Sequence, residues 1–134
     1  MGERHAEGIL DTCVYIDLAE ISPGLLPAKP KLTVVSMTEL QQGVAMAKEP
    51  AERARRTERL GDAVTAFNPL PFDGPAASRF GTMVALTLAA GRDPRPRRLD
   101  LMIASIASVR GLPLYTRNAD DFKGLESAVT VVAI

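Results

Sequence analysis

The chain has 134 residues, of which 46% are hydrophobic and 24% are charged, and its Lys and Arg residues balance its Asp and Glu residues. This length suits one domain with a single core, and this composition excludes a disordered chain. Because the formal net charge is zero, no overall basic field attracts nucleic acid, and any such affinity must come from a local site.

The first residues and the apolar runs indicate a cytoplasmic chain. The longest apolar run, residues 83–90, is too short to span a bilayer, and residues 1–8 contain no apolar signal core. The one cysteine, Cys13, cannot form a disulfide within the chain, which fits a reducing compartment. We expect one cytoplasmic domain over residues 1–134, with residues 1–8 as a flexible tail.

The first half of the chain alternates apolar runs of strand length with patterns of helical period. The expected elements, in chain order, are a strand at 9–10, a short helix at 14–18, a loop at 22–30, a strand at 32–35 and helices at 36–48 and 50–64. The loop is rich in Pro and Gly, whereas the second strand is rich in β-branched residues.

The second half continues this alternation. The expected elements are a weak strand at 66–70, a helix at 75–90, a basic loop at 92–98, a helix at 99–110 and strands at 112–116 and 129–134. Asp73 can cap the first of these helices, and Gly91 and Gly111 can end the two helices. Strands that alternate with helices predict an α/β fold, in which a mainly parallel central sheet is flanked by helices.

Acidic side chains gather near the carboxyl ends of the expected strands, which is where polar sites form in parallel sheets. Asp11 follows the first strand, Glu39 comes shortly after the second, and Asp121 follows the strand at 112–116. Asp100 lies in the first turn of the helix that leads into that strand. Several carboxylates at one edge repel one another and need a compensating cation.

Each of these acids also has an ordinary structural role. Asp11 can cap the helix that follows it, and the spacing of Ser36 and Glu39 matches a capping box. Asp100 can stabilise the start of its helix through the helix dipole, and residues 116–122 can simply form a turn. Only their convergence favours a functional site.

The ligand chemistry of the acids indicates the metal. Oxygen ligands without a nearby cluster of His or Cys suit Mg²⁺ or Mn²⁺ rather than zinc. A carboxylate-held ion of this kind can activate water and neutralise charge on a phosphodiester during its cleavage. We therefore expect hydrolysis of phosphodiester bonds with Mg²⁺ as cofactor and Mn²⁺ as a substitute.

Four segments carry a resemblance to a known family. They are ILDTCVYIDL (9–18), VVSMTELQQG (34–43), LDLMIASIA (99–107) and GLPLYTRNADDF (111–122). In this order, the chain resembles the PIN-domain family and, within it, the VapC-type toxins of bacterial toxin–antitoxin pairs. The resemblance implies a PIN-like three-layer sandwich, Mg²⁺-dependent endoribonuclease activity and inhibition by a cognate VapB-like antitoxin.

The resemblance also implies roles for individual residues. It maps four catalytic acids onto the chain, namely Asp11, Glu39, Asp100 and Asp121. Asp11 and Asp100 would hold the metal most directly. The fourth position departs from the simplest pattern, because Asn118 stands where some members carry an acid and the acid follows three residues later. The supporting candidates are Thr12 and Thr116, which could hydrogen-bond the acids or a phosphate, and Asn118, which could orient a ligand.

Basic side chains offer possible local contacts to RNA. The candidates lie in the proline-stiffened segment before the helix at 99–110 and are Arg92, Arg95, Arg97 and Arg98. They could bind phosphates, and a solvated loop is the ordinary alternative. The arginines of the helix at 50–64 lie among glutamates, which favours pairing along that helix over contact with RNA.

Two other functions remain open from the sequence. A receiver-like phosphoacceptor domain shares the architecture and binds Mg²⁺, although it needs paired acids after the first strand and a lysine near the last. A non-catalytic interaction module is the second alternative. The partners expected from the resemblance are an antitoxin, an RNA substrate and a second copy of the chain, in a homodimer or a toxin–antitoxin hetero-oligomer, without a membrane.

Overall fold

A computed structural model of the protein describes residues 4–134. Within these residues, four strands form one sheet in the order β2-β1-β3-β4, and each pairing of neighbours is parallel. The strands are β1 (Glu7–Leu10), β2 (Lys29–Lys31), β3 (Leu114–Thr116) and β4 (Val131–Ala133). The carboxyl ends of the two central strands, β1 and β3, therefore lie side by side.

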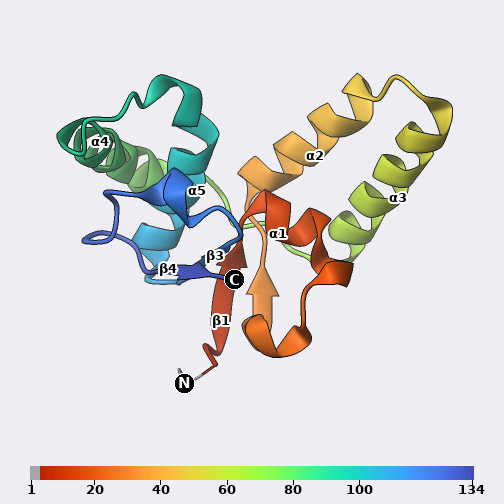
Figure 1. The fold of residues 1–134 in the computed structure, drawn as a ribbon, viewed down its shortest axis with the longest axis horizontal. Helices are drawn as coiled ribbons and strands as arrows, with labels where there is room; N and C mark the ends of the chain where they lie inside the picture. Colours follow the sequence, from red (N-terminus) through yellow and green to blue (C-terminus); the bar gives the residue numbers. More distant parts are fainter. Residues whose placement is uncertain (1–3) are drawn as a thin grey trace.

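Helices cover both faces of this sheet (Figure 1). The α-helices are α1 (Thr12–Ile16), α2 (Val34–Met46), α3 (Pro50–Ala66), α4 (Gly74–Ala89) and α5 (Arg98–Arg110). Short 3₁₀ turns are η1 (Leu18–Glu20), η2 (Pro23–Leu25), η3 (Arg95–Arg97) and η4 (Ala119–Phe122). The helices α4 and α5 lie on one side of the molecule, α2 and α3 lie on the other, and α1 lies between the two pairs.

Successive residues of the central strands point to opposite faces of the sheet, and each face carries its own apolar cluster. In β1, Ile9 belongs to the cluster that includes residues of α4 and α5, whereas Leu10 belongs to the cluster that includes residues of α1, α2 and α3. In β3, Leu114 and Tyr115 divide in the same way, because they pair in register with Ile9 and Leu10. This arrangement confirms the predicted three-layer α/β sandwich.

Local end signals place α4 and α5 as predicted. The carboxylate of Asp73 accepts a hydrogen bond from the backbone N–H of Ala76 over 3.1 Å and so caps the start of α4. Gly111 follows α5 with a φ of 64°, in the left-handed region that glycine adopts at little cost. These two signals depend only on neighbours in the chain, which is why the sequence reveals them.

The second strand does not lie where the sequence places it. The strand β2 is Lys29–Lys31, inside the predicted loop, and the β-branched residues Val34 and Val35 open α2. Thr33 explains the difference, because its hydroxyl accepts from the backbone N–H of Ser36 and starts the helix there. The predicted strand at 66–70 is likewise reduced to one parallel bridge, between Thr33 and Leu70.

The start of the chain takes part in the sheet. The strand β1 includes Glu7 and Gly8, two residues that the sequence places in a tail, and the ring of His5 meets Tyr115 edge to face at 6.1 Å. The remainder of that predicted tail, residues 1–3, lies outside the described residues. Among residues 4–134, no helix combines the length and the hydropathy that crossing a membrane requires.

Candidate functional site

Asp11 lies at the carboxyl end of β1, where the chain turns into α1. Its backbone N–H donates to the carbonyl of Tyr115 over 2.9 Å, which fixes this turn against β3. Asp11 as a whole residue is only 5% exposed, and its carboxylate accepts from the backbone N–H of Thr12 (2.9 Å) and from the hydroxyl of Thr116 (2.8 Å). Burial raises the pKa of Asp11, and these hydrogen bonds offset the rise only in part.

Glu39 extends from α2 to the same edge of the sheet. The hydroxyl of Thr12 donates to Oε1 of Glu39 over 2.6 Å. Burial raises the pKa of Glu39, the hydrogen bond from Thr12 lowers it, and the negative charge of Asp11 raises it. The capping-box alternative is wrong, because Thr33 caps α2 through the N–H of Ser36 and Glu39 bonds to α1 instead.

Asp100 and Asp121 complete a group of four acids. Burial, together with the charges of Asp11, Asp121 and Glu39, raises the pKa of Asp100 to about 7. Arg97 lowers this pKa in part, and its guanidinium lies 3.7 Å from the carboxylate of Asp121. The four acids therefore lie close enough to repel one another, as the sequence predicts for one edge of a parallel sheet.

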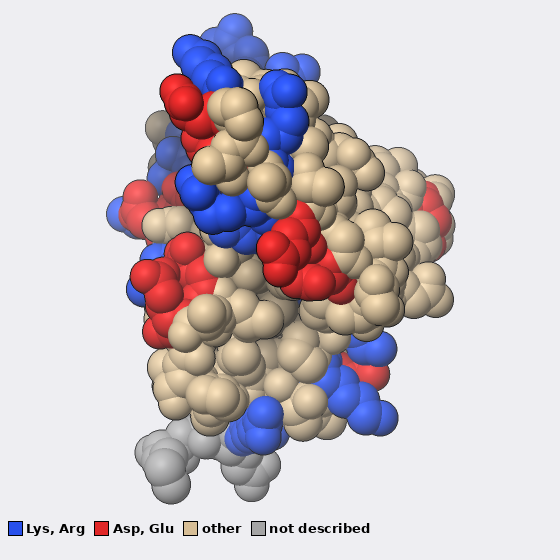
Figure 2. All heavy atoms as spheres, turned by 90° about the vertical axis from the view of Figure 1, so that its right-hand side faces the viewer, with Lys and Arg blue, Asp and Glu red and all other residues tan. Residues whose placement is uncertain are grey.

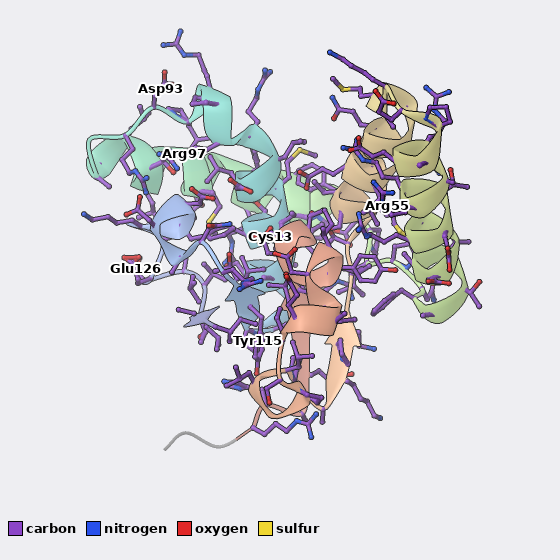
Figure 3. The ribbon with its side chains drawn as sticks, turned by 45° about the vertical axis from the view of Figure 1, so that its right-hand side comes forward. Cys13, Arg55, Asp93, Arg97, Tyr115 and Glu126 are labelled. Carbon is purple, nitrogen blue, oxygen red and sulfur yellow. The ribbon has the colours of Figure 1, made fainter. Side chains whose placement is uncertain are left out.

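Thr116 and Asn118 support Asp11 from the end of β3. Thr116 is fully buried, and its hydroxyl both donates to Asp11 and accepts from the backbone N–H of Asn118 over 2.9 Å. The amide of Asn118 lies 3.5 Å from Sγ of Cys13, which is labelled beside α1 in Figure 3. Burial and the neighbouring Asp11 raise the pKa of the Cys13 thiol, which opposes a role as nucleophile.

The donor set fits a hydrated hard cation better than a closed cage of protein ligands. Within residues 4–134, no three side chains of Asp, Glu, His or Cys are grouped closely enough to hold one ion between them. Mg²⁺ usually keeps several waters and binds through one or two carboxylates. Asp11 and Asp100 suit the role of these carboxylate ligands. Burial and neighbouring acids raise the pKa values of both, and a bound cation would stabilise their charged forms.

The basic segment before α5 is largely paired with acids of the chain. Arg92 lies 3.3 Å from Asp120, and Arg95 lies 3.1 Å from Asp93. Arg97, labelled in Figure 3, pairs with Asp121 and so connects this segment to the four acids. On the α3 side of the molecule, Figure 2 likewise shows basic and acidic side chains interspersed, which agrees with the zero net charge.

Ser36 is a site residue that sequence reasoning missed. It is fully buried, and its hydroxyl lies 2.8 Å from that of Thr12, although 24 positions separate the two residues. A contact at that separation depends on the tertiary fold. The one signal in the sequence is its place three residues before Glu39 on the same helix, a spacing that equally fits a capping box.

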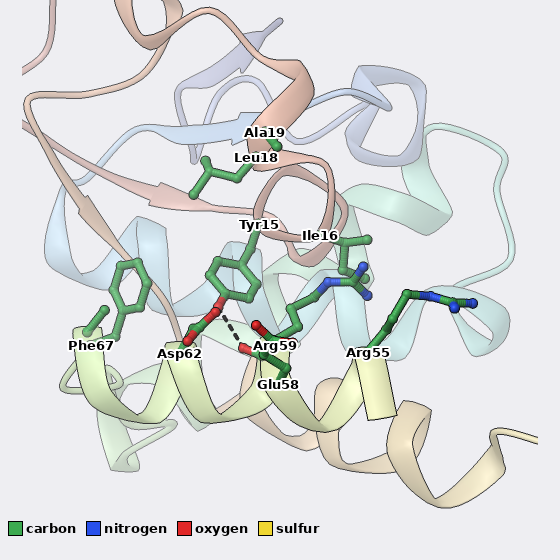
Figure 4. Close-up of a pocket in the computed structure, with 10 residues that line it drawn as sticks. Tyr15, Ile16, Leu18, Ala19, Arg55, Glu58, Arg59, Asp62 and Phe67 are labelled. Carbon is green, nitrogen blue, oxygen red and sulfur yellow. Dashed lines mark hydrogen bonds between the residues drawn. The ribbon is translucent and has the colours of Figure 1, made fainter. Parts of the chain in front are cut away.

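A groove of ≈ 700 Å³ lies between α3 and the segment of α1 and η1 (Figure 4). Residues that line it include Tyr15, Ile16, Ala19, Arg55, Arg59 and Phe67. The hydroxyl of Tyr15 donates to the carbonyl of Arg59 over 2.8 Å and so joins the two walls. A smaller cavity of ≈ 300 Å³ shares Ile16 and Arg59 with the groove and is also lined by Glu39, so the groove leads toward the acids.

Comparison with known proteins identifies relatives at the level of sequence, although no family model matches the chain. The chain is 35% identical to Ribonuclease VapC5 of Mycobacterium tuberculosis over an alignment of 137 positions, which spans all of this chain and 98% of the relative. It is 34% identical to Ribonuclease VapC8 of the same species over 106 residues, which span 77% of this chain and 92% of the relative.

Solved structures agree with this result. A chain of VapBC-5 from Mycobacterium tuberculosis, a member of the VapBC family of toxin–antitoxin systems, matches with a TM-score of 0.84 and 34% identity over 96% of this chain and 99% of that one. A chain of DNA-bound VapBC from Salmonella typhimurium shares the fold, with a TM-score of 0.74 and 21% identity over 93% of this chain and 96% of that one. With full-length identity of 35% to a VapC ribonuclease, the chain belongs to the VapC family of PIN-domain toxins.

Proposed function

We propose that the chain is a divalent-metal-dependent endoribonuclease that acts as the toxin of a toxin–antitoxin pair. The observation that carries the proposal is the convergence of Asp11, Glu39 and Asp100, whose pKa values all rise because burial and mutual repulsion disfavour their charged forms. Such a group of acids is stabilised by a cation. The names of the relatives, Ribonuclease VapC5 and VapC8, support RNA as the substrate.

Membership of this family implies a divalent metal, and we propose Mg²⁺, with Mn²⁺ as a substitute. Asp11 and Asp100 would hold the ion, and Glu39 and Asp121 would complete its surroundings directly or through waters. When bound, the ion would lower the pKa of a water molecule and neutralise charge on the phosphodiester. All-oxygen ligands fit either of these two ions.

The side chains of the site would then orient and deprotonate the attacking water. Glu39, held at Oε1 by Thr12, keeps Oε2 available to accept a proton from that water. Thr116 holds Asp11 at Oδ2, and the backbone N–H of Thr12 holds it at Oδ1, so this carboxylate cannot rotate freely. We propose that Asn118 positions these groups through its backbone contact with Thr116.

The basic segment would bind RNA phosphates at the edge of the site. Arg95 is the most exposed of the paired arginines in this segment, and the guanidinium of Arg98 donates to the carbonyl of Arg95. Arg92 and Arg97 would have to exchange their bonds to Asp120 and Asp121 for bonds to phosphate. Contacts of this kind weaken as salt concentration rises.

Cleavage of labelled RNA with and without Mg²⁺ tests this function. Asp11→Asn and Asp100→Asn should abolish metal-dependent cleavage. A matched control is Asp17→Asn, because Asp17 lies on the same short segment as Asp11 but pairs with Arg117 at 3.1 Å, away from the group of acids. Metal-dependent cleavage that persists in both acid variants would show that the assignment of the site is wrong.

Neighbouring carboxylates allow the fourth acid to be identified. Asp121 contributes to the raised pKa values of Asp11 and Asp100, whereas Asp120 is exposed and pairs with Arg92. Asp121→Asn should therefore reduce cleavage and Asp120→Asn should not. A loss of cleavage in Asp120→Asn but not in Asp121→Asn would identify Asp120 as the fourth acid instead.

The proposed partner is a VapB-like antitoxin in an oligomeric assembly within the cytoplasm, since structural neighbours are VapBC complexes. Its inhibitory segment would lie in the groove between α1 and α3, from which the smaller cavity leads to Glu39. The groove suits such a segment because it combines aromatic rings with charged side chains of both signs, namely Tyr15, Phe67, Arg55, Arg59, Glu58 and Asp62.

A large side chain placed in the groove should affect inhibition by the antitoxin without affecting RNA cleavage. Ala19→Trp should weaken binding of the antitoxin and leave RNA cleavage by the free toxin unchanged, because Ala19 lines the groove and lies apart from the acids. Ala85→Trp, on an exposed position of α4, is the matched control. Full inhibition of Ala19→Trp by the antitoxin would exclude this groove as its binding site.

A further inference from the structure

Thr12 connects two of the four acids to a buried serine. Its backbone N–H donates to Oδ1 of Asp11 over 2.9 Å, and its hydroxyl donates to Oε1 of Glu39 over 2.6 Å. The same hydroxyl lies 2.8 Å from Oγ of Ser36. One threonine therefore holds acids from β1 and α2, and Ser36 is the next group in that chain of bonds.

The number of hydrogens on these hydroxyls determines the direction of the bonds. A threonine hydroxyl has one hydrogen, and that of Thr12 points to Glu39. In the bond between Ser36 and Thr12, the donor must then be Ser36. Ser36 is fully buried, and within residues 4–134 this is the one hydrogen bond of its side chain.

The start of α2 leaves the Ser36 side chain available for this bond. Thr33 caps the helix by accepting from the backbone N–H of Ser36 over 3.2 Å, so the hydroxyl of Ser36 is not needed as a cap. Ser36 and Glu39 are three residues apart on α2 and therefore lie on one face of it, toward Thr12. The donor to the Thr12 hydroxyl, Ser36, and the acceptor of its hydrogen, Glu39, thus both belong to α2.

We infer that Ser36 is a positioning residue of the ribonuclease site, which directs the single hydroxyl hydrogen of Thr12 to Glu39 and so fixes the orientation of that carboxylate. The inference rests on the proposed function. Without the Ser36 hydroxyl, Thr12 loses its donor, and its hydroxyl can rotate away from Glu39. The carboxylate then samples orientations that are unproductive for cleavage.

Ser36→Ala tests the inference against a matched control. Ser105 is also fully buried, but its hydroxyl donates to the carbonyl of Leu101 in its own helix, so Ser105→Ala removes a buried hydroxyl without touching Thr12. We expect kcat for RNA cleavage to fall roughly 10- to 100-fold in Ser36→Ala, the range typical of residues that orient metal-site ligands, with KM unchanged. Equal losses in the two variants, or a loss confined to KM, would overturn the inference.

Combination with Thr12→Val shows whether Ser36 acts through Thr12. If it does, Ser36→Ala should cause no further loss of kcat in a Thr12→Val background, because the hydroxyl that it orients is already gone. Multiplied losses would mean that Ser36 acts independently, which contradicts the inference. This outcome does not depend on the absolute stability of either variant, because both backgrounds carry the same serine change.

A second readout separates this inference from the proposed function. Calorimetry should show a dissociation constant for Mn²⁺ that is roughly 10-fold higher in Ser36→Ala than in wild type or Ser105→Ala, whether or not the chosen RNA is cleaved. Wild-type cleavage that Asp11→Asn abolishes, with kcat and Mn²⁺ affinity intact in Ser36→Ala, would refute the role of Ser36 alone. Absence of metal-dependent cleavage by the wild type would refute the proposed function instead, and cleavage that persists in both Asp11→Asn and Asp100→Asn would refute its proposed site.

Discussion

Replacement of Asp100 by Asn should stabilise the metal-free protein at pH 8. Burial and the charges of Asp11, Asp121 and Glu39 raise the pKa of Asp100 from 3.8 to about 7. Between pH 3.8 and about 7, Asp100 keeps a proton in the folded protein that it has released in the unfolded chain. The free energy of unfolding therefore falls as pH rises through this range. Above the folded pKa the whole penalty for ionised Asp100 is present, and the neutral amide removes it.

The structure sets the size of this effect. A rise from 3.8 to about 7 would correspond to about 4 kcal/mol at full strength, but solvent screening of the partly exposed carboxyl of Asp100 reduces this to about 1–2 kcal/mol. For a chain of this length, that gain raises the melting temperature by about 3–8 °C. The gain should be smaller at pH 5, because only part of the penalty has developed there.

Thermal unfolding of Asp100→Asn and wild type in EDTA measures the gain in melting temperature at pH 5 and at pH 8. Asp93→Asn is the control, because its hydrogen bonds and charge interaction with Arg95 hold the pKa of Asp93 below its usual value, so neutralising it should bring no gain. An Asp100→Asn variant that melts at or below the wild-type temperature at pH 8 would refute the proposed repulsion. An equal gain at both pH values would show that the effect does not come from charge.

Three further perturbations test other parts of the molecule. Thr116→Val removes the hydroxyl that donates to Asp11 and nearly preserves volume, so cleavage should fall roughly 10- to 100-fold while circular dichroism stays unchanged. Gly8→Ala would place a Cβ 2.5 Å from Cε1 of Tyr115 and should cost about 1–3 kcal/mol in urea unfolding, whereas Gly81→Ala, in open space, should cost nothing. Mn²⁺ at about 100 times its dissociation constant should raise the free energy of unfolding of the wild type by about 2.7 kcal/mol and leave that of Asp11→Asn unchanged. An equal rise in both proteins would show that the ion binds elsewhere.

Much of the fold follows from signals that are local in the sequence. The cap at Asp73 and the left-handed Gly111 each act on their own helix, and the order of strands and helices predicts a parallel sheet. The segment at 32–35 shows where local propensity fails. Val34 and Val35 favour a strand, but Thr33 caps a helix at that point, and the packing of α2 on the sheet outweighs the weak preference of two residues.

The candidate site, too, was predictable from the sequence only in part. The convergence of the acids follows from topology, because residues after parallel strands must meet at one edge. The partners of the acids do not follow, since Thr12 meets Ser36 and Glu39, and Thr116 meets Asp11, across large separations along the chain. These contacts depend on the register of β1 and β3 and on the placement of α2, which no short motif encodes.

The most direct test of the proposed cation site is a crystal of the protein soaked in Mn²⁺ and measured for anomalous scattering. The proposal predicts a peak bound by carboxylate oxygens of Asp11 and Asp100, with Glu39 and Asp121 adjacent to it directly or through waters. A peak bound by other residues, or no peak at a concentration of Mn²⁺ that supports RNA cleavage, would contradict it.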